Sequence, residues 1–203
     1  MQSNSILVQI GELKLDNYIM LLSRKIRAGL TLLFFVSNIY LWYNKCNMFN
    51  LTEKENIEFN NLINDLANDD NIKKMKKYIQ HGTTNTYTHV INVAKLSFII
   101  NKKLNLNCDE KIMLTGAMLH DFYLYDWHEK DEERDEKYGL HGFSHPEVSL
   151  INAKKYFEIN DKVENIIFSH MWPLTITQIP KCKEAWVVCT ADKISSLMET
   201  FKR

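Results

Sequence analysis

The stretch MLTGAMLHDFYLYDW, residues 113–127, decides the fold, because an apolar, helix-forming run ends there in a histidine and an aspartate side by side. Burying His120 and Asp121 without partners would cost on the order of several kcal/mol. We therefore expect this pair to hold a metal ion or to bind each other. Other residues of ligand type lie elsewhere in the chain: His89 upstream, and His145, His170 and Asp192 downstream.

Helical periodicity places these outlying residues on inward faces. His89 begins a stripe with apolar residues at i+4, i+7 and i+11, and His170 ends a second stripe that starts at Val163. Asp192 lies in the middle of the apolar run AWVVCTADKI. A carboxylate in such a run needs a cation.

The composition limits the possible classes of protein. The chain has 203 residues, enough for one domain of ordinary size with an appendage. Its formal net charge of zero gives no general attraction to nucleic acid or anionic lipid, although a local basic pocket for a phosphate is compatible with it. Glycine and proline are scarce and most of the chain has helical period, so the sequence predicts an all-α fold.

The cysteines are scattered and lack the CxxC spacing of zinc sites. We expect each of them to be a small core residue: Cys46, Cys108, Cys182 and Cys189. Because there is neither a disulfide framework nor a cleavable signal, these thiols indicate a reducing compartment, the cytoplasm.

Residues 1–50 differ from the rest and are predicted to be an N-terminal extension, with the main domain in residues 51–203. The extension contains the apolar stretch Ala28–Tyr43, which follows a short basic run. A helix of this length spans roughly 24 Å, against about 30 Å for a bilayer core. Two interpretations stay open: a marginal membrane anchor with the main domain in the cytoplasm, or a hydrophobic helix that packs on the domain or precedes a start at Met48.

Several element boundaries can be predicted. Asn50–Tyr78 is typical of one or two amphipathic surface helices, with a break at Asn68–Asn71 and apolar residues at Ile57, Leu62, Ile63, Leu66 and Met75. His81–Gly82 opens a turn, and Asn85 or Thr86 then caps the helix of His89. Asp109 is the expected N-cap of the central helix, where Gly116 and Ala117 leave room for another helix.

The second half of the chain is predicted to contain a charged loop and two further helices. Asp131–Lys137 is a charge run, expected as a solvated loop and a candidate lid over a site. Pro146 suits a first helical position, which would put His145 at the entrance of a helix. Asp161 and Glu164 resemble a capping pair for the helix of His170.

Buried polar residues from several separate segments would be expensive in a core without a shared partner. Imidazoles combined with carboxylates suit iron, manganese or zinc, whereas magnesium prefers oxygen ligands. Six ligand side chains are more than one tetrahedral zinc ion needs. Two metal ions bridged by one carboxylate would use all six.

The order H…HD…H…H…D resembles the HD-domain superfamily of metal-dependent phosphohydrolases, over roughly Tyr78 to Glu199. The surrounding motifs HGTTNTYTH, LHDFYLYDW, HGFSHPE, HMWPL and ADKISS are similar to a bacterial subgroup of small HD proteins. This resemblance implies an HD-domain helical bundle that follows the N-terminal hydrophobic helical extension. It also implies that His89, His120, Asp121 and Asp192 hold a first metal, and that His145 and His170 complete a second, with Asp121 bridging.

The implied reaction is hydrolysis of a phosphomonoester or phosphodiester by a metal-activated hydroxide at a binuclear centre. The implied cofactors are two divalent ions, iron or manganese first, with zinc, nickel, cobalt or magnesium as alternatives. Asp121 would orient the bridge. Lys193 could stabilise phosphate charge or be an ordinary surface lysine, and His141 could donate a proton to a leaving group or be a loop histidine without a special role. We expect His81 and His128 to be surface or structural residues.

The substrate expected from the resemblance is a small phosphorylated molecule, nucleotide-like, with no nucleic acid polymer as partner. Tyr125 and Trp127 could form a base-stacking wall, although core positions fit them better. Two alternatives use the same ligands: an HD-fold di-iron oxygenase similar to myo-inositol oxygenase, and a non-catalytic, nucleotide-sensing helical protein. The ligand set alone does not separate them.

Overall fold

The computed structural model describes residues 50–129, 132 and 139–201, all of which belong to one compact unit. The N-terminal extension with its apolar stretch Ala28–Tyr43 lies outside the described residues. So does the charge run Asp131–Lys137, apart from Glu132. Within the described part of the chain, no helix is both long and apolar enough to cross a bilayer.

The chain first forms the surface helix α2 (Glu53–Asn68), the short helix α3 (Asp70–Lys73) and the 3₁₀ turn η2 (Lys74–Lys77). The break falls inside the predicted segment, where the Asp69 side chain accepts hydrogen bonds from two backbone amides of α3. Of the apolar residues in this segment, Ile63 and Met75 are buried. Ile57 is 56% exposed, and Phe59 is the buried residue on this turn of α2.

A two-stranded antiparallel ribbon, β1 (Ile79–His81) and β2 (Thr84–Asn85), precedes the core helices. The turn predicted at His81–Gly82 joins its strands, and Gly82 there has a φ of 56°, which favours glycine. Asn85 then caps the next helix by accepting a hydrogen bond from the Thr88 amide. The turn and the cap were predicted, but the strand pairing was not.

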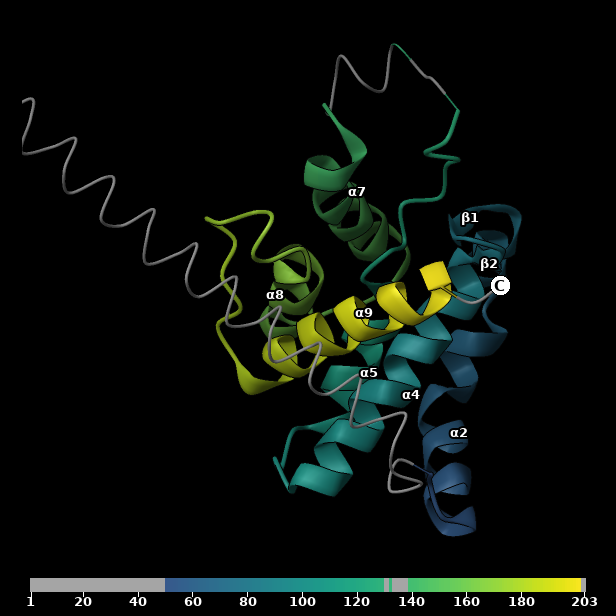
Figure 1. The fold of residues 1–203 in the computed structure, drawn as a ribbon. Coiled ribbons are helices and arrows are strands. Elements are labelled where there is room, and N and C mark those ends of the chain that lie inside the picture. Colours follow the sequence, from purple (N-terminus) through teal and green to yellow (C-terminus); the bar gives the residue numbers. More distant parts are fainter. Residues whose placement is uncertain (1–49, 130–131, 133–138, 202–203) are drawn as a thin grey trace, which may run out of the picture. The chain divides into compact units, whose positions relative to one another are not determined.

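The core is helical, as predicted (Figure 1). Helix α4 (Thr86–Leu104) lies against α5 (Glu110–Leu119) and α9 (Lys183–Phe201), and α8 (Asp161–Ser169) packs on both α5 and α9. Helix α7 (His141–Tyr156) packs mainly on α8. The predicted stripes on α4 and α8 are buried, so His89 and His170 face the interior.

Two predicted helix starts are wrong. Helix α7 begins at His141 rather than at Pro146, which lies inside the helix. A proline in the second turn removes one backbone hydrogen bond and crowds the carbonyl four residues earlier, but the amides of Phe143 and Ser144 have already closed the first turn on the Leu140 carbonyl. Helix α8 is capped by Asn160 instead of the predicted Asp161 with Glu164, because the Asn160 side chain accepts hydrogen bonds from two amides of the first turn.

The close approach of α8 to α5 depends on Gly116. A Cβ atom at this position would lie 2.6 Å from two side-chain carbons of Ile166. Gly142 in α7 offers a contrast, because its Cβ would make an ordinary contact of 3.6 Å with Leu174. The sequence predicted that Gly116 admits a neighbouring helix, and the structure identifies that helix as α8.

We predict that Gly116→Ala lowers the free energy of unfolding by about 1–3 kcal/mol through overpacking, despite a gain in helix propensity of about 1 kcal/mol. Gly142→Ala, the matched control, should be neutral or stabilising. Urea unfolding gives the change in the free energy of unfolding for both variants and for the double variant Gly116→Ala with Ile166→Ala. Equal effects at the two glycines would contradict the packing argument.

Candidate metal centre

Six side chains of ligand type converge in the interior from five segments, and all six are buried. His89 comes from the body of α4, and Asp192 comes from α9. His120 and His170 are the C-caps of α5 and α8, Asp121 follows His120, and His145 lies in the second turn of α7. The structure thus brings together every residue that the sequence singled out as a metal ligand.

Asp121 lies between two groups of histidines. Its Oδ2 atom is 3.6 Å from Nε2 of His89 and 3.4 Å from Nε2 of His120. Its Oδ1 atom is 3.3 Å from Nε2 of His145 and 3.5 Å from Nε2 of His170. Each carboxylate oxygen therefore faces a different pair of imidazoles.

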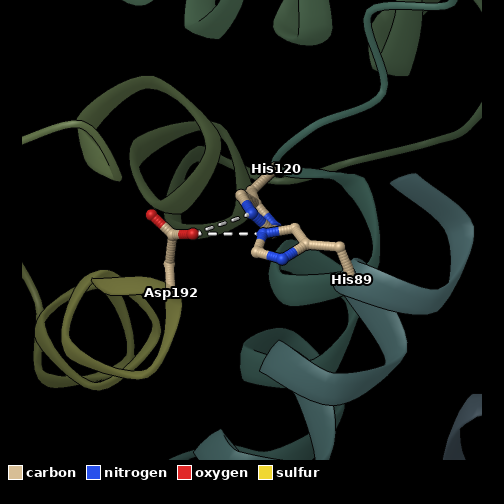
Figure 2. A group of neighbouring side chains, drawn as sticks. All are labelled: His89, His120 and Asp192. Carbon is tan, nitrogen blue, oxygen red and sulfur yellow. Dashed lines mark hydrogen bonds and ion pairs between the residues drawn. The ribbon is translucent and has the colours of Figure 1, made fainter. Parts of the chain in front are cut away.

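Asp192 completes the first of these groups. Its Oδ1 atom lies 3.2 Å from Nε2 of His89 and 3.7 Å from Nε2 of His120. Figure 2 shows Asp192 facing both rings. We call His89, His120 and Asp192 the first group, and His145 and His170 the second group. Ligand atoms bound at about 2.0–2.2 Å to one ion lie roughly 3–3.5 Å apart, which is close to the spacing within each group.

All four histidines are oriented in the same way. The Nδ1–H groups of His120, His145 and His170 each donate to a backbone carbonyl of their own turn, at 2.7 Å, namely those of Ala117, His141 and Ile167. Nδ1 of His89 donates instead to the carboxylate of Glu199, at 2.8 Å. With Nδ1 donating in every ring, the Nε2 atoms face Asp121, the arrangement that metal-binding histidines use.

The electrostatics of the site favour a cation. Burial alone would lower the pKa of His89, but its hydrogen bonds with Asp192 and Glu199 outweigh burial and raise this pKa to about 10. Burial would likewise raise the pKa of Asp121, but neighbouring histidines, His120 first, hold it well below its usual range. Burial lowers the pKa of His170 to about 4, so this ring is neutral at pH 7 with its lone pair available.

Buried polar atoms without partners at the centre fit a bound metal ion. Among the described residues, Nε2 of His120 and Oδ1 of Asp121 are buried atoms without a hydrogen-bond partner. Nε2 of His145 lies 2.8 Å from Nε2 of His170, so two lone pairs would face each other if both rings were neutral. Ligand atoms of His120 lie within 4.8 Å of those of His89 and Asp192, and also of those of Asp121 and His170. A bound cation would satisfy these atoms.

The family follows from a comparison made on the sequence. The HD domain family matches residues 86–197, more than half of the chain. The chain belongs to this family. Comparisons with curated proteins and with solved structures gave no match. HD domains are generally metal-dependent phosphohydrolases, which agrees with a buried cluster of histidines and aspartates that could hold metal.

A cavity of about 360 Å³ opens onto the centre of this HD domain. Asp121, Asp192 and the second group contribute to its wall, and the other lining residues that bear on its chemistry are Gln80, His81, Trp127, His141, Lys193 and Ser196. Lys193 is half-buried, and its Nζ donates to Oδ2 of Asp192 and to the carbonyl of His170. It is therefore not an ordinary surface lysine.

Stacked rings form one wall of the cavity. Trp127 stacks on His128 and on His141, with ring centroids at 3.9 and 5.0 Å, and His141 also stacks on His145 at 4.5 Å. The Tyr125 hydroxyl is 2.8 Å from Nδ1 of His141. Trp127 and Tyr125 are half-buried rather than core residues, and Trp127 lines the cavity, so the base-stacking wall stays a prediction.

The remaining two histidines differ from each other. His128 is exposed, as predicted, and its ring nitrogen lies 3.1 Å from Oδ1 of Asp126. His81, predicted as surface or structural, lines the cavity and packs edge-on against His89. It is the last residue of β1.

Three residues around the centre were missed by the sequence analysis. Nε2 of Gln80 donates to Oδ2 of Asp121 at 2.6 Å, while its own carbonyl accepts from the Tyr123 hydroxyl. Ser196 donates to Oδ1 of Asp192, and Glu199 accepts from His89. A signal existed for the last two, because i+4 and i+7 from Asp192 lie on the same face of α9. No comparable signal marked Gln80.

We predict that a metal ion stabilises the folded chain. At a hundred times its dissociation constant, Mn²⁺ should add about 2.7 kcal/mol to the free energy of unfolding, roughly 5–10 °C in melting temperature. Asp121→Asn should abolish this shift. Thermal unfolding with EDTA and with Mn²⁺ measures it, and Glu184→Gln, a buried carboxylate of α9 away from the cavity, is the matched control. A shift that persists in Asp121→Asn would refute the assignment.

Proposed function

We propose that this HD domain is a phosphohydrolase that uses two divalent metal ions, iron or manganese, on a small phosphorylated substrate. One observation carries the proposal: the two oxygens of Asp121 face two different groups of imidazoles. A carboxylate in this position suits a bridge between two ions. The first group with Oδ2 would hold one ion, and the second group with Oδ1 would hold the other.

Bound there, the two ions would act as Lewis acids on phosphoryl oxygens and lower the pKa of a bound water. The chain itself keeps the four imidazoles in one tautomer, because each Nδ1–H has a fixed acceptor. It also keeps the carboxylates ionised, since the pKa values of both Asp121 and Asp192 lie well below their usual range.

We assign Lys193 to phosphate charge stabilisation. Burial would lower its pKa, but contact with Asp192 first, together with other neighbours, raises it, so Nζ stays protonated at pH 7. The ammonium group lines the cavity and is held in place by Asp192 and the His170 carbonyl. A fixed positive charge costs no reorganisation when negative charge develops on a phosphoryl group.

We assign His141 to proton donation toward the leaving group. Its ring is part of the cavity wall and is held by the Tyr125 hydroxyl and by stacking on Trp127 and His145. It is the first residue of α7 rather than a loop residue, so its backbone is fixed as well. General acid catalysis by a positioned histidine contributes about 10²–10⁴-fold.

The size of the cavity supports a small substrate. A volume of about 360 Å³ is near the lower end of ligand pockets, which run from about 300 to 1,000 Å³. A mononucleotide or a similar small phosphoester is compatible with that volume. We therefore favour a nucleotide-like substrate and no nucleic acid polymer.

The proposal predicts metal-dependent release of inorganic phosphate or of a phosphomonoester from a panel of small phosphoesters and nucleotides. Asp121→Asn should lower kcat by about 10³-fold or more, and EDTA should abolish turnover until Mn²⁺ or Fe²⁺ is restored. The measurement combines phosphate release with oxygen uptake on the same samples. Oxygen consumption without phosphate release would identify an oxygenase, and metal binding with neither reaction would identify a non-catalytic sensor.

The roles proposed for His141 and Lys193 predict different kinetic effects of their substitution. His141→Gln should lower kcat for an alkyl phosphate by about 10²-fold or more, but hardly affect p-nitrophenyl phosphate, whose leaving group needs no proton. Lys193→Met should lower kcat/KM for both substrates about equally. Metal content is measured on each variant. An equal loss on both substrates for His141→Gln would exclude the proton-donor role.

A further inference from the structure

Glu199, near the C-terminal end of α9, is bound at both carboxylate oxygens. Oε2 accepts the Nδ1–H of His89 at 2.8 Å, and Oε1 accepts an amide N–H of Asn92 at 2.8 Å. Its side chain is only 5% exposed. The two hydrogen bonds fix this carboxylate beside the first group.

The partner of His89 differs in kind from those of the other three histidines. His120, His145 and His170 donate to neutral backbone carbonyls of their own helical turns. His89 donates to an ionised side chain that is distant in sequence. A carboxylate on the far nitrogen fixes both the tautomer and the ring orientation, and it raises the basicity of the nitrogen that faces the metal.

We propose that Glu199 is a positioning residue for the first metal ion, an inference that rests on the metal centre proposed above. It acts through His89 and touches neither the ion nor the substrate. Glu199 lies outside residues 86–197, the span that matches the HD domain family, so membership of the family does not assign it this role.

The ribbon at the start of the domain supports the position of Glu199. A Cβ on Gly82, in the turn between β1 and β2, would lie 3.0 Å from the backbone oxygen of Glu199, so the turn lies close against this end of α9. The same ribbon supplies Gln80, which donates to Asp121. Two ligands of the first ion, His89 and Asp121, are thus oriented by a ribbon and a helix end that contact each other.

The test is the affinity of the full-length chain for Mn²⁺, followed by electron paramagnetic resonance of the free ion. Glu199→Gln keeps a hydrogen-bond acceptor but loses the charge, whereas Glu199→Ala loses both. We expect one of the two Mn²⁺ sites to weaken by about 10–100-fold in Glu199→Gln and further in Glu199→Ala, with the other site changed by less than about threefold. Glu184→Gln is the matched control, because it neutralises another buried carboxylate of α9.

A milder variant keeps the proposal testable if the substitutions at Glu199 prevent folding. Asn92 is exposed, and Asn92→Ala removes only the anchor on Oε1, so the domain should fold and its first site should weaken less than in Glu199→Gln. Unchanged Mn²⁺ affinity in folded Glu199→Gln or Asn92→Ala, with only a lower melting temperature, would reduce Glu199 to a structural residue. Absence of Mn²⁺ binding by the unmodified chain would instead refute the proposed metal centre itself, and the role of Glu199 with it.

Discussion

The rest of this structure depends on the contacts that surround the buried carboxylate of Asp121. It is buried among four imidazoles, two facing each oxygen, and it also accepts a hydrogen bond from Gln80. An ionised carboxylate in such a place is tolerable only with compensating donors or cations. The helices that meet around it are therefore constrained to present polar atoms at one point of an otherwise apolar core.

The helices meet this constraint in two ways. Where a histidine caps a helix or lies in its first turns, a carbonyl of the same turn orients the ring, as for His120, His145 and His170. His89 lies in the body of α4 and is oriented from another helix by Glu199. Helix ends thus supply self-contained ligands, whereas a ligand within a helix requires tertiary structure to fix its ring.

This difference explains how much the sequence could predict. Periodicity placed His89, His170 and Asp192 on inward faces because a helix stripe is a local property, and the order of the six residues indicated that they meet. Gln80 could not be found, because its contact with Asp121 depends on a ribbon that forms only through tertiary packing. Pro146 misled the assignment of α7, since a proline rule that holds for first turns does not forbid a proline in the second.

Negative charge is distributed unevenly over the centre. The first group contains the carboxylate of Asp192 and is in contact with those of Asp121 and Glu199, and Lys193, bonded to Asp192, offsets part of this charge from the cavity side. The second group has neutral acceptors on both Nδ1 atoms, and its anionic contact within the described part of the chain is the Oδ1 atom of Asp121. In a low-dielectric interior such a difference is strongly felt, because water does not screen it. The first group is therefore the stronger cation site by electrostatics, while the second adjoins the ring wall of His141 and Trp127 that lines the cavity.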